Sequence, residues 1–338
     1  MNLRTTTRFC AALATLCSFP AAAEDPLYTK NLSPVAGLIG LPAQRDADTP
    51  ERGNLAVALH AGLANTYIFD TTTTEYLNQD GEVLRFALEM RYGLAENWDV
   101  QLEVPWMQHD GGVLDRVIDD WHDLFNMSDG GRDDVPRDLL EYRYATGQGG
   151  FRLNDSSSGL GDISLSLNHV FYRHKNAVAG VRLGYKFGSG DEDDFTGSGE
   201  DDAYIALHFS GQHLSSLPLD WHGQVGYLHA GDSDLLGERQ EQDLWFAGLA
   251  LDWRLSERWS LIGQLDSHAA PMDSDITALG DVAGMVTVGT RWRFASRWAL
   301  DLSLVEDILV ETAPDIIFQA SLRYRLRPDS QTGTAASY

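Results

Sequence analysis

Charged residues of both signs recur at alternate positions along several segments of this 338-residue chain. Because neighbouring side chains of a β-strand point to opposite faces, this spacing gathers the charges on one face of each strand. The residues placed on such an inward face are Arg85, Glu89, Arg91, Asp99, Glu103, Arg182, Lys186, Arg291 and Arg323. Mixed charges that line a pore can select solutes. The alternative is a network of ion pairs that fills a narrow barrel and leaves no pore.

A second group of charges is purely acidic and lies between two such segments. Residues 188–202 contain no lysine or arginine, and their acidic members are Asp191, Glu192, Asp193, Asp194, Glu200, Asp201 and Asp202. Clustered carboxylates suit hard cations, so one interpretation is binding of Ca²⁺ or Mg²⁺ by this loop. The other interpretation is a solvated, self-repelling loop, which is the usual role of a charge run.

No set of residues has the spacing of a catalytic site. Ser164 and His169 lie on one expected strand but on opposite faces, so they cannot form a nucleophile–base pair. The ten histidines have no cysteine partners outside residues 1–23 that would indicate structural zinc. The formal net charge of −25 argues against nucleic acid, whose phosphates attract basic proteins. We therefore expect no enzymatic activity, the alternative being a lipid-modifying site assembled across strands. We expect no cofactor apart from the divalent cation considered for the acidic loop.

These charges lie on about twelve expected strands in which apolar and polar residues alternate. In the last of them, Ile316 and Phe318 share one face while Gln319 and Arg323 share the other. An even number of antiparallel strands, each with one apolar face, is typical of an up-and-down transmembrane β-barrel. We expect strands over residues 55–63, 84–92, 98–106, 163–171, 179–187, 203–209, 219–227, 245–253, 259–265, 286–294, 298–304 and 316–326.

The connections between these strands alternate in length, as they do in bacterial outer-membrane barrels. Short turns alternate with long acidic loops, and Trp98, Trp259 and Trp298 each follow a short turn. Tryptophan is favoured at the lipid headgroup boundary. We therefore expect short periplasmic turns, long extracellular loops, contact with outer-membrane lipids and lipopolysaccharide, and insertion by the barrel-assembly machinery. A soluble β-sandwich also has alternating strands, but its tryptophans would not gather at every second turn.

The chain divides into four parts. Residues 1–23 have the basic start, short apolar run and small final residues of a cleaved signal peptide. Residues 24–53 form a periplasmic N-terminal arm, residues 54–326 the barrel, and residues 327–338 a short C-terminal tail. The arm is apolar and punctuated by prolines, so we expect it to enter the lumen as a plug, because exposed apolar surface is costly. A disordered tether is the alternative.

The longest connection spans residues 109–154. Apolar residues recur at helical spacing over residues 114–125, which predicts an amphipathic helix. Loops of this length fold into the mouth of a barrel, cover it, or meet a partner.

Two stretches resemble known families. The arm over residues 25–42, with the first strands, looks like an uncharacterised proteobacterial outer-membrane barrel family, domain-of-unknown-function family 3187. The segments Ser158-Gly-Leu-Gly-Asp162 and Gly188-Ser-Gly-Asp191 are similar to that family and to MetA-like barrels associated with phenol-degradation pathways. The proline usual before the second segment in those barrels is absent here. The resemblance implies an outer-membrane barrel but no established reaction or solute.

These patterns lead to two hypotheses about function. The first is a narrow, passive outer-membrane channel for a small solute of unknown identity. The second is a non-conducting envelope or surface protein whose acidic loops interact with divalent cations, lipopolysaccharide or another partner. A continuous lumen would favour the channel, and a blocked lumen would favour the surface role.

Overall fold

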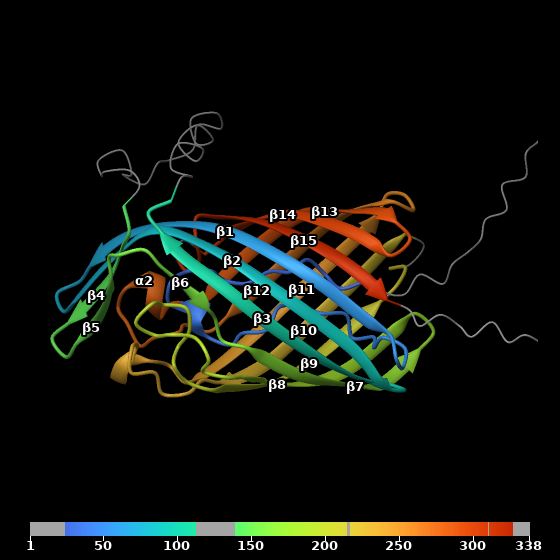
Figure 1. The fold of residues 1–338 in the computed structure, drawn as a ribbon, viewed down its shortest axis with the longest axis horizontal. Coiled ribbons are helices and arrows are strands. Elements are labelled where there is room, and N and C mark those ends of the chain that lie inside the picture. Colours follow the sequence, from blue (N-terminus) through green and yellow to red (C-terminus); the bar gives the residue numbers. More distant parts are fainter. Residues whose placement is uncertain (1–23, 113–138, 215–216, 310, 327–338) are drawn as a thin grey trace, which may run out of the picture.

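The computed structural model describes residues 24–112, 139–214, 217–309 and 311–326. In these residues, twelve antiparallel strands form a closed barrel wall (Figure 1). The barrel closes where β1 pairs with β15. The wall strands are β1 (Leu55–Thr71), β2 (Glu75–Ala95), β3 (Trp98–Asp110), β7 (Ser164–His174), β8 (Ala177–Lys186), β9 (Asp202–Gly211), β10 (Leu219–His229), β11 (Asp243–Arg254), β12 (Trp259–His268), β13 (Ala283–Ala295), β14 (Trp298–Asp307) and β15 (Ile316–Leu326). The strand number and the antiparallel architecture expected from the sequence are confirmed.

Two wall strands extend well beyond the segments that the alternation predicts. β1 continues to Thr71 and β2 begins at Glu75, so their hairpin projects past the rest of the wall at the left of Figure 1. The projecting part includes the consecutive polar residues Asn78, Gln79 and Asp80. A segment outside the lipid needs no apolar outer face, so its sequence lacks the signal that marks a membrane strand.

Three short strands follow β3 in the longest connection, where the alternation predicts none. β4 (Glu141–Thr146) pairs with the projecting part of β2, and β5 (Gly150–Leu153) pairs with β4. β6 (Ser157–Leu160) and β7 pair with successive parts of β3 and are separated by residues 161–163. The amphipathic helix expected over residues 114–125 lies outside the described residues.

The outer face of the wall is apolar. Large hydrophobic side chains such as Leu183, Leu249 and Val288 are about half exposed there, because outward positions of the strands have no protein neighbour. Beside the short turns, the Trp259 ring stacks on that of Trp292 with centroids 5.7 Å apart. An apolar band bordered by aromatic rings is the surface of a bacterial outer-membrane barrel. We therefore call the short-turn end periplasmic and the opposite end extracellular.

The helical elements of the described ranges are η1 (Ala36–Leu38), η3 (Gly237–Arg239) and α2 (Thr277–Gly280). Across those same ranges, no helix has both the length and the apolar character needed to cross a membrane.

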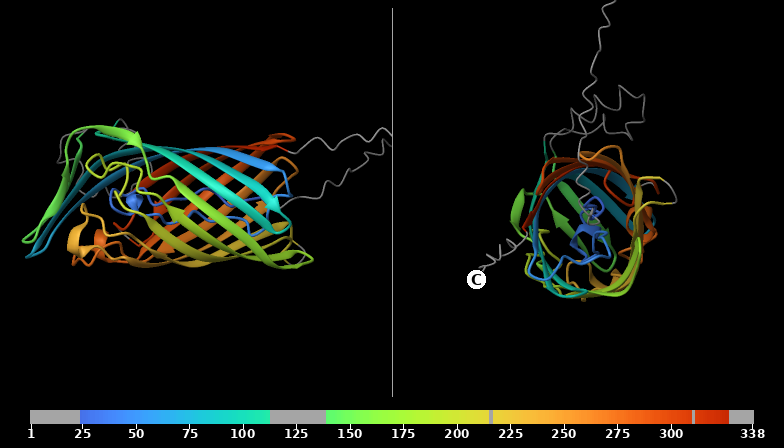
Figure 2. Two further views of the ribbon diagram at one scale, coloured as in Figure 1. Left: turned by 60° about the horizontal axis from the view of Figure 1, so that its bottom comes forward. Right: turned by 90° about the vertical axis from the view of Figure 1, so that its right-hand side faces the viewer.

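The arm, residues 24–53, lies inside the barrel rather than below it. Figure 2 shows it in dark blue within the ring of strands, seen from the periplasmic end. It starts beside Arg293, rises along the lumen to η1, and descends again to Asp48 beside Arg173. Both ends of the arm therefore lie at the periplasmic mouth, and its tip lies near the extracellular loops.

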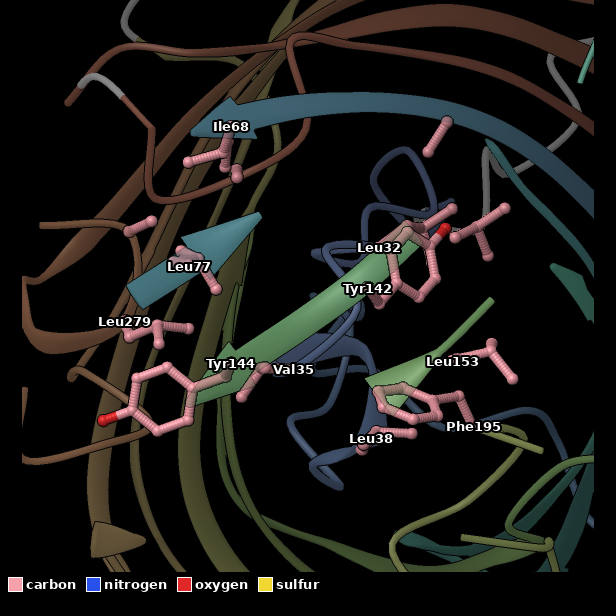
Figure 3. Packing of buried hydrophobic residues seen from close by; sticks show 14 of the residues in the cluster. Leu32, Val35, Leu38, Ile68, Leu77, Tyr142, Tyr144, Leu153, Phe195 and Leu279 are labelled. Carbon is pink, nitrogen blue, oxygen red and sulfur yellow. The ribbon is translucent and has the colours of Figure 1, made fainter. Parts of the chain in front are cut away.

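The tip of the arm packs into an apolar cluster under the extracellular loops. Leu32, Val35 and Leu38 are almost completely buried in one cluster with side chains from the wall, the β4–β5 hairpin and four extracellular loops (Figure 3). The rings of Tyr142 and Phe195 pack against each other in this cluster, with centroids 6.0 Å apart. The extracellular end of the lumen is thus sealed by apolar packing.

Candidate functional site: the charged lumen and the arm within it

The sequence-predicted lumen residues do face inward, and most are buried. Eight of the nine fall in the buried class, and the Arg323 side chain is only 12% exposed. Their strands bring them together in three groups, which lie at the periplasmic end, at mid-height and at the extracellular end of the lumen. In each group the wall charges meet residues of the arm, so the site is built jointly by wall and arm.

At the periplasmic end, Asp301 of β14 binds two arginines of the neighbouring strands. Arg291 donates from Nε and Nη2 to its two carboxylate oxygens at 2.7 and 2.8 Å. Arg323 donates from Nε to Asp301 Oδ2 at 2.7 Å. This pairing follows from strand register, because Arg291 lies directly opposite Asp301. Farther along the wall, Arg91 of β2 makes an equivalent two-point contact with Asp99 of β3, at 2.9 and 2.8 Å.

The first two residues of the arm enter this periplasmic group. Glu24 Oε2 accepts hydrogen bonds from Arg293 Nε at 2.8 Å and from Arg291 Nη1 at 3.2 Å. Asp25 Oδ1 accepts one from Arg91 Nη1 at 3.3 Å. Burial favours the neutral acid, but the surrounding arginines outweigh it and hold the pKa of both arm carboxyls well below the ordinary range.

At mid-height the wall carboxylates also have arm partners. Glu103 binds Arg85 of the wall at 2.7 Å and accepts a hydrogen bond from the hydroxyl of Tyr28 at 2.9 Å. Glu89 pairs with Arg45 on the descending part of the arm. The Tyr28 ring also stacks on the wall side chain His60, with centroids 3.8 Å apart. Sequence reasoning treated the arm as apolar and missed these polar partners.

Near the extracellular end, Lys186 ties the wall to the arm and to the acidic loop. Its Nζ lies 2.9 Å from Asp162 Oδ2 and 3.0 Å from Asp202 Oδ2. It also donates to the carbonyl oxygen of Leu38 at 3.1 Å. Asp202 completes the link by accepting from the backbone N–H of Gly40 at 2.7 Å.

Arg182 is the exception among the predicted lumen residues. It is 2% exposed, and its Nη2 has no hydrogen-bond partner among the residues that the structure describes. A buried guanidinium nitrogen without a partner carries a desolvation cost that an anion or water in the lumen would relieve.

The carboxylates of the acidic loop mainly hold its own backbone. Asp191 Oδ1 accepts from the N–H groups of Asp193 and Asp194 at 3.0 and 3.3 Å. Asp201 Oδ1 accepts from the N–H of Gly188 at 2.8 Å, and Glu192 has a raised pKa because of partial burial and the nearby Asp234. Among the described residues, no three or more metal-ligating side chains are grouped so that they could hold a metal ion. Asp193, Asp194 and Glu200 point to solvent.

The lumen is open at its periplasmic mouth and narrow beside the arm. A cavity of about 840 Å³ opens there and is lined by Asp25, Arg91, Arg173 and Arg325, among others. Beside the rising part of the arm, the space between arm and wall shrinks to a void of about 30 Å³, which is enough for about one water molecule. The arm therefore occupies the path between the two ends.

Comparison with solved structures supports the fold. The COG4313 outer membrane channel from Pseudomonas putida F1 aligns with a TM-score of 0.53 at 15% identity, covering 83% of this chain and 97% of that one. The NanC porin has a TM-score of 0.48 at 7% identity, covering 80% and 100% of the two chains. The toluene transporter TodX of P. putida has a TM-score of 0.37 at 11% identity, covering 86% and 92%. The last two are too distant to support any argument about this chain.

Comparison at the level of sequence gives a family but no characterised relative. No curated protein matches the chain. A family model does match it, over residues 3–326, and confirms the family resemblance noted from the arm and the glycine–aspartate segments. The chain therefore belongs to the family described as "Protein of unknown function (DUF3187)".

Proposed function

We propose that this protein is a narrow outer-membrane channel for small solutes, and that its N-terminal arm is a removable plug that closes the lumen at rest. The observation that carries the proposal is the path of the arm. It enters and leaves through the periplasmic mouth, with Glu24 and Asp48 at its two ends. The arm can therefore be withdrawn without breaking a strand pair of the wall.

The nature of the arm–wall contacts also supports a plug that can leave. A permanent core is held mainly by apolar packing, whereas the periplasmic and middle parts of the arm are held by ion pairs and hydrogen bonds. Each wall carboxylate that the arm binds, such as Glu89 or Glu103, would face water in an emptied lumen. A lumen lined with charged side chains suits a water-filled pathway better than a dry core.

The wall leaves room for the arm at positions that carry no side chain. A Cβ on Gly248 of β11 would lie 2.4 Å from Nε2 of Gln44 in the arm. A Cβ on Gly93 of β2 would lie 2.3 Å from the carbonyl oxygen of Glu51. These glycines accommodate a separate segment that lies against the inner wall, as a plug must.

A disulfide between arm and wall tests the proposal. Thr29 Oγ1 of the arm and Thr287 Oγ1 of β13 are 2.9 Å apart, and both native cysteines lie within residues 1–23. The double variant T29C/T287C of the mature protein would therefore contain one engineered disulfide, with T287C alone as its matched control. Single-channel conductance is recorded in planar bilayers before and after reduction.

The plugged channel predicts silence from the oxidised double variant, discrete conductance steps after reduction, and no effect of reductant on the control. Steps from the oxidised protein as well would mean that solutes pass beside the arm, which contradicts a plug. Silence in every state, with the barrel shown to be folded by heat-modifiable gel mobility, would contradict a channel.

One observation favours the second candidate, a non-conducting envelope protein. The tip of the arm is sealed among apolar side chains from the loops, including Tyr142 and Phe195. A permanent seal of this kind would leave the acidic loops as the functional surface, with divalent cations or lipopolysaccharide as their partners. Silence in all states of the disulfide experiment is the result that this candidate predicts.

A further inference from the structure

We infer that the arginines at the periplasmic end of the lumen form an anion-binding site, which the arm's own Glu24 and Asp25 occupy at rest, and that the solutes are small organic carboxylates. The part about solutes rests on the proposed channel function, whereas the anion site itself does not.

The wall residues of this group carry more positive than negative charges. We call Arg91, Arg291, Arg293, Arg323 and Arg325 the arginine cluster. The wall places three carboxylates among them, those of Asp99, Asp252 and Asp301. The wall alone therefore carries a surplus of two positive charges. Glu24 and Asp25 of the arm supply the two missing negative charges.

The geometry shows that the arm binds as an anionic ligand would. Glu24 lies within 4 Å of three arginines of the cluster, at 3.2 Å from Arg291, 2.5 Å from Arg293 and 3.8 Å from Arg325. Asp25 lies between Arg91 of β2 at 3.3 Å and Arg323 of β15 at 3.6 Å, two strands that both pair with β1. Guanidinium groups bind carboxylates through paired, charge-assisted hydrogen bonds. A free carboxylate can use the same donors.

Backbone carbonyls of the arm occupy the remaining donors. Arg291 Nη2 donates to the carbonyl oxygen of Asp25 at 2.8 Å, and Arg323 Nη2 donates to that of Pro26 at 3.0 Å. When the arm leaves, these donors and two uncompensated positive charges line the emptied lumen. A surplus of one sign of charge along a narrow, low-dielectric wall raises the local concentration of the opposite ion, so the empty site attracts an anion from solution.

The same group offers little to a cation. Asp301 is bound by two arginines and Asp99 by one, each through short hydrogen bonds. Among the described residues Asp252 Oδ1 has no hydrogen-bond partner, but Asp252 Oδ2 lies 3.9 Å from both Arg291 and Arg293. Next along the wall, the buried guanidinium of Arg182 extends the positive field, since it lies near Arg91 and Arg45 and has an unpartnered Nη2 within the described part of the chain. The field at this level of the lumen therefore favours anions.

The cluster is accessible while the arm is still in place. Arg91, Arg325 and Asp25 line the cavity of about 840 Å³ at the periplasmic mouth, and the Arg325 side chain is 39% exposed. An anion in this cavity competes directly with Asp25 and Glu24 for the arginines. Its binding and the docking of the arm's first residues are therefore mutually exclusive.

Binding of citrate, a tricarboxylate, tests the site without reference to conduction. Isothermal titration compares the wild-type protein with E24Q/D25N, whose arm loses both competing charges. The control is E51Q/E96Q, which removes the same charge from residues that line the same cavity but do not bind the cluster. We expect E24Q/D25N to bind citrate about tenfold more tightly than wild type, equivalent to about 1.4 kcal/mol, and the control to bind like wild type.

Adding R293Q/R325Q to E24Q/D25N should remove the gain in affinity. R325Q alone, at the more exposed position, is the fallback if the quadruple variant fails to fold, and it should remove part of the gain. Equal citrate affinity in wild type and E24Q/D25N, or a gain that survives loss of the arginines, would overturn the anion site.

Measurements of solute flux distinguish a failure of the anion site from a failure of the proposed channel function. Proteoliposomes carrying wild type, E24Q/D25N or the control are tested with glucuronate and glucose, which differ by one carboxylate. We expect E24Q/D25N to raise the glucuronate-to-glucose flux ratio about fivefold, by electrostatic selection in the lumen. An equal rise for both sugars would leave the channel standing and overturn the solute class. No flux in any variant, with citrate binding intact, would overturn the channel and leave the anion site standing.

Discussion

Lys186 donates a hydrogen bond from Nζ to the carbonyl oxygen of Leu38, at 3.1 Å. This contact joins the wall of the barrel to the last residue of η1, at the tip of the arm. Because Lys186 also binds Asp162 and Asp202, one buried ammonium group links the arm, the acidic loop and the break between β6 and β7. Movement of the tip must disturb all three.

Replacing Lys186 by glutamine should therefore loosen the tip and the acidic loop together. The change leaves Asp162 and Asp202 buried without a positive partner, which costs about 3–5 kcal/mol of unfolding free energy. We expect faster amide hydrogen exchange over residues 36–41 and 188–202 in K186Q. Loss of protection over only one of the two segments would show that they are not coupled.

The matched control is Arg173→Gln at the periplasmic mouth. Arg173 pairs with Asp48 of the arm at 2.6 Å, but its side chain is 44% exposed. An ion pair in that setting contributes at most about 1 kcal/mol. R173Q should leave exchange at the tip unchanged.

Gly93 marks the place where the arm leaves the lumen. A Cβ on this residue would lie 2.3 Å from the carbonyl oxygen of Glu51 and 2.5 Å from that of Pro50, both of them backbone atoms. G93A should therefore displace the descending end of the arm, at a cost of about 1–3 kcal/mol for overpacking. We expect faster proteolysis within residues 43–53 of the refolded protein. G263A is the control, because a Cβ on Gly263 has no atom within 4 Å, and equal proteolysis of both variants would contradict this role.

The wall of the barrel was predictable because one rule, alternation, repeats along every membrane strand. That rule also placed Arg85, Glu103 and Arg291 inside, since the lipid-facing positions must be apolar. The alternation rule failed for the segments that lie outside the lipid. The β1–β2 projection and the β4–β5 hairpin have no face toward lipid. Their buried apolar residues, such as Leu77, Tyr142 and Phe151, face the cluster under the loops instead. In β4 and β5 the alternation covers only six and four residues, which is too short to distinguish a strand from a loop.

The contacts of the arm could not be predicted from the sequence for a different reason. The arm is an irregular segment, and its contacts depend on how it lies against the wall. Examples are the contacts of Glu24 with Arg293 and of Tyr28 with Glu103. No periodicity relates residues that are so far apart in the chain. The sequence did contain one chemical indication of these contacts. The arm begins with two acids, Glu24 and Asp25, and many of the charges assigned to the lumen are arginines.

The acidic loop provides a test of the divalent-cation hypothesis. Its exposed members Asp193, Asp194 and Glu200 are free to contact an ion, while Asp191, Asp201 and Asp202 are engaged by backbone N–H groups or by Lys186. High-affinity calcium sites need six to eight oxygen ligands. We therefore expect calcium titration to give the same weak response in wild type and in D193N/D194N/E200Q. A saturable calorimetric signal lost only in the triple variant would instead establish a site.

The pH dependence of arm docking should be controlled by Asp46. Burial, followed by the charge of Asp25, raises the pKa of this carboxyl to about 7 in the docked arm, against an ordinary value of 3.8. Arg91 and His222 face it from β2 and β10, with His222 Nδ1 at 4.0 Å. At pH values between 3.8 and about 7, Asp46 is protonated in the docked arm and ionised in the released arm. Raising the pH through this range therefore weakens docking.

Glu24 and Asp25 act in the opposite direction and in a lower range. Their pKa values are depressed in the docked arm, so they weaken docking only as the pH falls below the ordinary carboxyl range. From about pH 5 to about pH 7 the effect of Asp46 should thus dominate, and reduced T29C/T287C should open more often at the higher pH. D46N in the same background should abolish the trend, whereas H222Q, measured beside it, should preserve it. A trend lost in H222Q but kept in D46N would assign the titration to the histidine instead.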